Sequence, residues 1–236
     1  MRCALLGGWT QVDPTAYDGW DGHCPGCDVD VMNVYAATRK YSFDHATILL
    51  NAAGNRETVR SVFDMYSRML KPNDLFLIYD SGHVGQNKDQ DGDEADGLDE
   101  YFCWWDGRVY DDTVHDYLAM IPAGVRVLFV ADTCHAEGMP RSAAPRTIAR
   151  AVDDAVKAQI IYYGACQEQR SSYGSEAGGV FTNAWMHVLG GAYNGTALTY
   201  RNWLGRTGNC MPRSQKPTYT EVTEVSDAFR NGEAMR

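Results

Sequence analysis

The chain has 236 residues, with 31 acidic and 21 basic side chains, and its formal net charge at pH 7 is −10. A nucleic-acid partner is not expected, because binding to phosphates needs a basic face. The apolar run near the start is shorter than the core of a signal peptide, and no window approaches the roughly 20 apolar residues of a membrane span, so we expect a cytoplasmic protein without membrane contact.

Strands and helices alternate along the predicted chain. Apolar runs of strand length predict five strands: Cys3–Leu6, Ala46–Leu50, Leu75–Tyr79, Val125–Val130 and Gln159–Tyr163. Amphipathic stretches predict five helices: Val29–Lys40, Asn55–Leu70, Asp111–Met120, Ala144–Ala158 and Val180–Leu189. The polar tail after Thr199 predicts an edge strand or a surface loop. Because the strands are apolar on both faces, we expect a mainly parallel sheet covered by helices on both sides.

Polar residues follow three of these strands directly. They are "DSGHVG" (80–85), "DTCHAEG" (132–138) and "GACQEQRSS" (164–172). Because the carboxyl ends of parallel strands meet at one edge of the sheet, we expect the chemistry of the protein to lie there.

A cysteine and a histidine follow two neighbouring strands of this sheet. A thiol becomes a strong nucleophile when an imidazole helps to remove its proton. His135 adjoins Cys134, but successive side chains of a strand point to opposite faces, so His135 is poorly placed as the base. We therefore predict a dyad of His83 as base and Cys134 as nucleophile. On the pattern alone, a structural cysteine at a strand end remains an equal alternative.

The segment "HCPGC" (23–27) contains the one cysteine pair with metal-like or redox-like spacing. A structural zinc site needs a second ligand pair, and none with tight spacing follows. A dithiol redox site usually opens a helix directly after a strand, whereas this pair follows a loop rich in glycine and aspartate. The pattern therefore disfavours both, and the odd total of seven cysteines favours free thiols.

The motifs together resemble one known family. "SGHVG" paired with "DTCHAEG" resembles the His-Gly and Asp-x-Cys motifs of metacaspases and orthocaspases, within the caspase-like (clan CD) cysteine peptidases. "GCDVDV" (26–31), the acidic loop 89–100, "GACQEQRSS" and "GGVFTNAW" (178–185) resemble further family segments in the same order, over residues 1 to about 190.

This resemblance implies a caspase-like three-layer α/β/α sandwich with a mainly parallel sheet of about six strands. It implies one domain over residues 1–236, with a large-subunit-like part (1–140), a linker (141–158) and a small-subunit-like part (159–236). It also implies a monomer. Arg141, Arg146 and Arg150 in the linker are then candidate self-cleavage sites.

The implied activity is endopeptidase cleavage after arginine or lysine, through a thioester on Cys134. The implied oxyanion hole consists of the backbone N–H groups of Cys134 and Val84. Val84 stands where the family usually has glycine, and a β-branched residue does not readily adopt a positive φ. Two alternatives therefore remain: a catalytically impaired member that binds peptides or regulates a partner, and a flavodoxin-like ligand-binding domain in which Cys134 is only a strand-end thiol.

The implied S1 pocket contains Asp30, Ser81, Asp132 and Glu168. Carboxylates that face one slot favour a guanidinium through charge-assisted hydrogen bonds, so the expected partner is a protein or peptide with Arg or Lys at the cleavage site. Outside the resemblance, Asp132 could cap a backbone N–H and Asp30 could complement a helix dipole.

No cofactor is expected to be required, and calcium is a candidate ligand. The acidic loop does not fit an EF-hand, because Gly92 is not at the sixth position and no glutamate closes the loop. The positions that resemble the calcium cluster of calcium-dependent metacaspases are Asp99, Asp111 and Asp112. The alternative is a solvated acidic loop.

Overall fold

The computed structural model describes residues 1–88, 98–135, 155–165, 174–191 and 197–236; for residues 98, 134 and 135 it describes the backbone alone. The strands of the main sheet are β1 (Arg2–Gly8), β2 (His45–Leu50), β3 (Leu75–Lys88), β4 (Leu98–Trp104), β5 (Gly107–Tyr110), β6 (Arg126–His135), β7 (Gln159–Gly164) and β10 (Thr218–Glu221). A separate small hairpin consists of β8 (Gly174–Ser175) and β9 (Gly178–Gly179). The helices are α1 (Cys27–Lys40), α2 (Arg56–Met69), α3 (Asp111–Ala119), α5 (Val180–Gly190), α6 (Tyr200–Asn209) and α7 (Asp227–Arg230), with 3-10 turns at Pro14–Ala16 and Asn51–Gly54.

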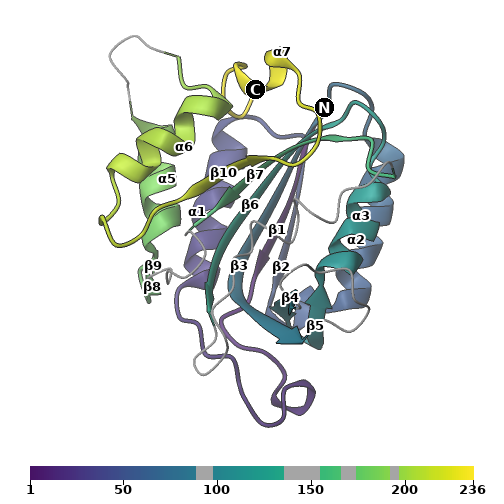
Figure 1. The fold of residues 1–236 in the computed structure, drawn as a ribbon, viewed down its shortest axis with the longest axis vertical. Helices are drawn as coiled ribbons and strands as arrows, with labels where there is room; N and C mark the ends of the chain where they lie inside the picture. The colour runs from purple at the N-terminus through teal and green to yellow at the C-terminus, as the bar shows by residue number, and fades with distance from the viewer. Residues whose placement is uncertain (89–97, 136–154, 166–173, 192–196) are drawn as a thin grey trace.

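The main sheet has the order β10-β7-β6-β3-β1-β2 (Figure 1). The four pairings among β7, β6, β3, β1 and β2 are parallel, and β10 runs antiparallel to β7 at the edge. The hairpin β4–β5 extends the sheet, because β4 pairs antiparallel with the second half of β3. The mainly parallel sheet is confirmed, and it has eight strands in the described part of the chain, where about six were expected.

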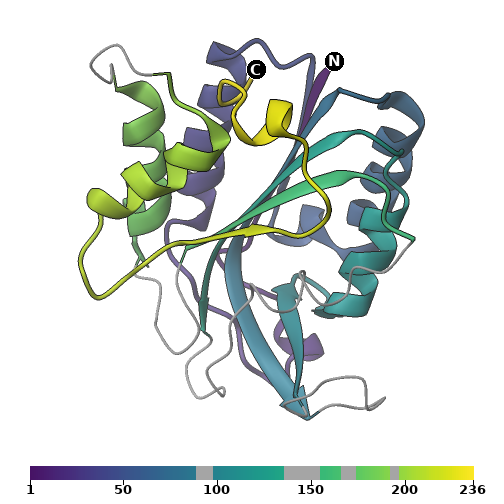
Figure 2. The same cartoon turned by 45° about the horizontal axis from the view of Figure 1, so that its top comes forward.

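Helices cover both faces of the sheet, as the flanking layers in Figure 2 show. Helix α1 packs with α5 and α6 over one face, around buried residues such as Val34 and Trp185. Helices α2 and α3 cover the other face, and Phe63 and Tyr117 stack there with ring centroids 5.1 Å apart. The three-layer α/β/α sandwich is confirmed.

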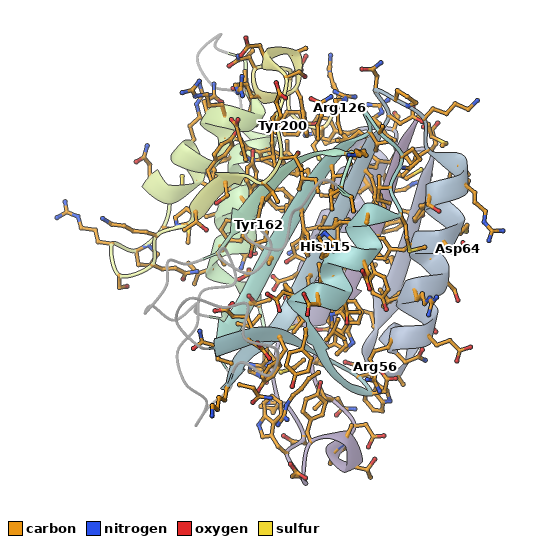
Figure 3. All side chains as sticks on the ribbon, turned by 45° about the vertical axis from the view of Figure 1, so that its right-hand side comes forward. Arg56, Asp64, His115, Arg126, Tyr162 and Tyr200 are labelled. Atoms are coloured by element: carbon orange, nitrogen blue, oxygen red, sulfur yellow. The ribbon has the colours of Figure 1, made fainter. Side chains whose placement is uncertain are left out.

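The end of the sheet where the parallel strands begin is closed by packed side chains. Figure 3 labels Arg126, at the start of β6, and Tyr200, at the start of α6. The guanidinium of Arg126 lies 5.8 Å from the ring centroid of Phe229, and this ring contacts Tyr200 at 4.9 Å. The site must therefore be sought at the opposite end, where the strands finish.

Two strands extend beyond the apolar runs that predicted them. We expected strands to end at Tyr79 and Val130, but β3 continues to Lys88 and β6 to His135. Their register is unbroken from Leu75↔Arg126 to Val84↔His135. Residues 80–88 and 131–135 are therefore strand rather than loop, because both segments pair with neighbouring strands.

Some elements were not predicted. The tail was expected to be only strand or loop, and β10 is such an edge strand, but α6 and α7 also form there. Helix α6 begins with a capping box, in which Thr199 and Asn202 each accept the other's backbone N–H. The hairpin β4–β5 was also missed. Most of the predicted helix Ala144–Ala158 lies outside the described residues, and residues 155–158 are not helical.

No helix in the described ranges combines the length and the apolar character that crossing a bilayer requires.

Candidate active site

The predicted base His83 lies in the second half of β3, between β4 and β6. Its register partner on β6 is Cys134, and its register partner on β4 is Cys103. The side chain is 9% exposed. Its Nε2 atom lies 3.3 Å from the carbonyl oxygen of His23, and the ring of Trp20 packs against it at 5.1 Å.

A cysteine therefore stands beside His83 on each neighbouring strand. Burial raises the pKa of the Cys103 thiol to about 12, and the charge of Arg108 offsets only part of this shift. Cys103 is 1% exposed and is expected to stay protonated, which excludes it as the nucleophile. The backbone of Cys134 occupies the register position directly beside His83, and its side chain lies outside the described atoms.

Asp30 and Asp132 form a pair of buried carboxylates. Asp30 lies in the first turn of α1, and Asp132 lies in β6, two residues before Cys134. The Ser81 hydroxyl donates to Asp30 Oδ2 at 3.0 Å, and the Gly179 N–H donates to Asp30 Oδ1 at 2.8 Å. Asp132 Oδ2 accepts from the Thr182 N–H at 3.1 Å and from the Thr182 hydroxyl at 2.7 Å. Three of the four residues predicted for S1 thus lie together.

Desolvation and mutual repulsion govern the charge of this pair. The pKa of Asp30 is raised to about 7. Burial is the main cause, and the negative charge of Asp132 is the second. The hydrogen bonds from Gly179 and Ser81 act in the opposite direction. At neutral pH the pair is therefore poised to lose a proton when a cation approaches.

Two glycines allow the hairpin β8–β9 to lie against these carboxylates. A Cβ atom at Gly179 would stand 2.2 Å from Asp132 Oδ2, and one at Gly178 would stand 2.5 Å from Asp30 Oδ1. Neither distance is tolerated by a real side chain. Together with Thr182, these residues were missed at the sequence level, because "GGVFT" was interpreted only as the start of a helix.

Val84 has an extended backbone. The non-glycine residues with positive φ in the described part of the chain are Asp18, Ser42, Asn51, Asn73 and Met235, and Val84 is not among them. Its side chain is 4% exposed and packs in the apolar core between the sheet and α2. A valine would strain the backbone at a positive φ, but Val84 does not have one, so this strain is absent.

A further buried acid, Asp80, was missed at the sequence level. It lies in β3, three residues before His83, and accepts a hydrogen bond of 3.0 Å from Trp104 Nε1. Burial raises its pKa to about 7, and the indole hydrogen bond offsets only part of this effect. A polar residue at the end of an apolar run was the available signal, although the pattern did not show on which side of the sheet it lies.

The carboxylates predicted for calcium are not brought together as a site. Asp99 lies in β4, whereas the buried Asp111 and the exposed Asp112 begin α3. Among the residues that the structure describes, no three His, Cys, Asp or Glu side chains are grouped so as to hold a metal ion. Glu168 and the acidic loop before Leu98 lie outside the described residues.

Comparison with known proteins identifies relatives over nearly the whole chain. The family described as "Caspase domain" matches residues 12–229. Metacaspase-1 of Schizosaccharomyces pombe is 33% identical over 127 residues, which are 48% of this chain and 30% of that protein. Metacaspase-1A of Neurospora crassa is 34% identical over 133 residues, which are 50% of this chain and 29% of that protein. The chain thus matches less than a third of the length of these curated relatives.

A solved structure matches the fold from end to end. The crystal structure of protein GSU0716 from Geobacter sulfurreducens aligns with a TM-score of 0.85 and 30% sequence identity. The alignment covers 99% of this chain and 98% of that one. The two proteins therefore share their fold over nearly the whole length of both chains.

Proposed function

Because the chain belongs to the caspase-domain family and is similar to metacaspases, we propose that it is a cysteine endopeptidase that cleaves proteins or peptides after arginine or lysine. The observation that carries the proposal is the register of β3 and β6. His83 stands beside Cys134, and Asp132 stands two residues before Cys134 in the buried pair with Asp30. The residues proposed as base, nucleophile and anionic pocket thus lie at one edge of the sheet.

The proposed reaction has two halves. His83 takes the proton of the Cys134 thiol, and the sulfur attacks the scissile carbonyl carbon. The tetrahedral oxyanion is held by the N–H groups of Cys134 and Val84 until the C–N bond breaks. His83 then donates its proton to the leaving amine, which leaves a thioester. In the second half, His83 accepts a proton from water, the hydroxide attacks the thioester, and the acid product and the free thiol are released.

The proposed specificity rests on the buried pair of carboxylates. An arginine or lysine side chain is stabilised by charge-assisted hydrogen bonds to Asp30 and Asp132. A substrate carboxylate would instead face two acids in a region of low dielectric constant, so cleavage after aspartate is disfavoured. We propose Glu168 as a further member of this pocket. The proposed enzyme needs no cofactor.

The test compares fluorogenic peptides that end in Arg, Lys or Asp, each with calcium and with a chelator. Cleavage after Arg or Lys is expected, and Cys134→Ala should lower kcat/KM by at least about a thousandfold, because the nucleophile is lost. Cys103→Ala is the matched control: it removes a cysteine at the same register position on the other side of His83, and cleavage should persist.

Three outcomes would overturn parts of the proposal. Cleavage that survives in Cys134→Ala would exclude this residue as the nucleophile. Preference for Asp would exclude the anionic pocket. No turnover of any peptide, with no labelling of Cys134 by an arginyl electrophile, would favour the catalytically impaired alternative.

A further inference from the structure

Two cysteine sulfur atoms lie in contact within the loop that precedes α1. The Sγ atoms of Cys24 and Cys27 are 3.1 Å apart, about 1 Å more than a disulfide bond. Both side chains are buried, with 9% and 3% of their surface exposed. The sequence disfavoured redox chemistry here, because the pair follows a loop rich in glycine and aspartate. In the structure, however, the second cysteine is the first residue of a helix of 14 residues.

The backbone of this turn is already arranged for a bond between the two sulfurs. Gly26 has a φ of 90°, which turns the chain tightly between Cys24 and Cys27. The N–H of Cys24 donates to the carbonyl of Thr10 at 2.8 Å, and the N–H of Asp30 donates to the carbonyl of Gly26 at 2.9 Å. Both ends of the turn are therefore fixed, so little conformational entropy would be lost when the sulfurs join.

A metal site does not account for the pair. Two thiolates supply half of a tetrahedral zinc site, and the remaining ligands must be histidine, cysteine or a carboxylate. No group of three such side chains suited to a metal occurs within the described ranges. Redox chemistry needs only the two thiols.

We propose that Cys24 and Cys27, whose sulfur atoms meet in the loop that carries the His23 carbonyl against His83, form a reversible dithiol–disulfide site that is oxidised by hydroperoxides and is coupled to His83. An effect of this disulfide on catalysis through His83 rests on the proposed peptidase function. The formation of the disulfide does not.

The oxidation proceeds in two balanced steps. In the first step the Cys27 thiol loses its proton. The sulfur attacks one peroxide oxygen, an S–O bond forms, the O–O bond breaks, and the leaving hydroxide takes up the proton to become water. Cys24 then loses its proton and attacks Cys27 Sγ, so that the S–S bond forms and the second oxygen leaves as water. The two thiols lose two electrons, and hydrogen peroxide is reduced to two waters; an external dithiol reverses the reaction.

The pair lies between two parts of the candidate active site. The residue before Cys24 is His23, whose carbonyl oxygen lies 3.3 Å from His83 Nε2. On the other side, the Gly26 Cα lies so close to the β8–β9 hairpin that a Cβ would stand 2.0 Å from Ser175 O and 2.8 Å from Gly178 N. Any shift of this segment when the sulfurs join is therefore passed to His83 on one side and to the hairpin on the other.

The first test uses the Cys134→Ala protein, so that the predicted nucleophile does not react. The reduced protein is treated with hydrogen peroxide, its free thiols are alkylated, and its peptides are analysed by mass spectrometry. The peptide with Cys24 and Cys27 should lose the mass of two hydrogens and escape alkylation, and dithiothreitol should restore both thiols. The exposed Cys210 is the internal control and should stay alkylated. Oxidation that leaves Cys24 and Cys27 alkylated, or that yields chiefly links to other cysteines, would overturn the proposal.

The second test measures the coupling without any substrate. The imidazole resonances of His83 are followed by NMR in reduced and oxidised Cys134→Ala protein, and in the same protein carrying Cys24→Ser. A shift on oxidation that is absent from the Cys24→Ser protein is expected. Unchanged His83 resonances after complete disulfide formation would refute the coupling. Because neither readout needs turnover, an inactive peptidase would leave both results interpretable.

Discussion

At the scale of single residues, Asp80 is a carboxylic acid that keeps its proton well above the pH at which an exposed aspartate ionises. Its pKa is raised to about 7 by burial, whereas in the unfolded chain it titrates near 4. Between these two values the folded protein holds a proton that the unfolded chain has lost. The free energy of unfolding therefore falls as the pH rises from about 4 to about 7, and the loss is complete above that range.

We expect Asp80→Asn to stabilise the protein above pH 7. The amide keeps an acceptor for Trp104 Nε1 and cannot ionise, but its buried NH₂ group offsets part of the gain. The net increase in the free energy of unfolding should be about 1–3 kcal/mol at pH 8, measured by urea denaturation, and should vanish near pH 4. Asp64→Asn makes the same change on α2 (Figure 3), where the carboxylate pairs with Arg68 at the surface, and should have little effect. A loss of stability in Asp80→Asn at pH 8 would contradict the prediction.

The pair Asp30–Asp132 predicts how binding of a cation depends on pH. Only the ionised form of Asp30 attracts a guanidinium, and its pKa is about 7. Binding of an arginyl peptide to Cys134→Ala protein should therefore tighten as the pH rises. The Kd should fall by up to about tenfold for each pH unit of increase up to pH 7, and should be constant above it. Calorimetry between pH 5 and 8 measures this dependence.

Two substitutions should move this transition in opposite directions. Asp132→Asn removes a neighbouring negative charge and should shift the transition to lower pH, although burial keeps the pKa of Asp30 raised. Ser81→Ala removes a hydrogen bond to the ionised form and should shift it to higher pH. A transition that stays in place in both variants would assign the titration to another group.

At the scale of secondary structure, the sequence predicts most elements and misjudges where they end. Helix α2 was predicted within one residue at each end, because Asn55 caps it and Val59, Val62 and Phe63 repeat at helical spacing. Strands β3 and β6 run on through polar residues, since their partners are other strands and hydrophobicity does not report pairing. For the same reason the hairpin β4–β5 was missed.

The capping box at the start of α6 is predicted to stabilise the protein. Thr199→Ala removes the side-chain acceptor of the Asn202 N–H and one half of the capping box. It should lower the free energy of unfolding by about 1 kcal/mol and the Tm by roughly 2–4 °C. Thr220→Ala, a half-buried position on the edge strand β10, is the comparison and should cost less. Equal losses in the two variants would mean that the cap is not what stabilises this helix.

At the scale of the whole molecule, two apolar cores hold the sheet between its layers, and each draws on residues from both halves of the chain. Ile160 of β7 packs in the core beneath α2, and Ile161 packs in the core beneath α1. The motifs in the sequence predicted this layered fold and the residues around His83. The contacts between distant segments could not be predicted in this way. Asp132, for example, binds Thr182, 50 residues further along the chain, and such pairs depend on how the elements are arranged, which a single sequence does not show.

This organisation predicts that the two fragments stay associated when the chain is cut between β6 and β7. The two strands lie side by side in parallel from Arg126↔Gln159 to Ala131↔Gly164, and β10 covers the outer edge of β7. Burial of their apolar side chains, rather than the covalent link, should hold the parts together. Cys134→Ala protein nicked with trypsin at Arg141, Arg146 or Arg150 should elute from a sizing column as one species at the volume of the intact protein, and should separate only in denaturant. Uncut protein is the control, and separation of the two fragments in native buffer would show instead that residues 1–140 and 159–236 are independent units.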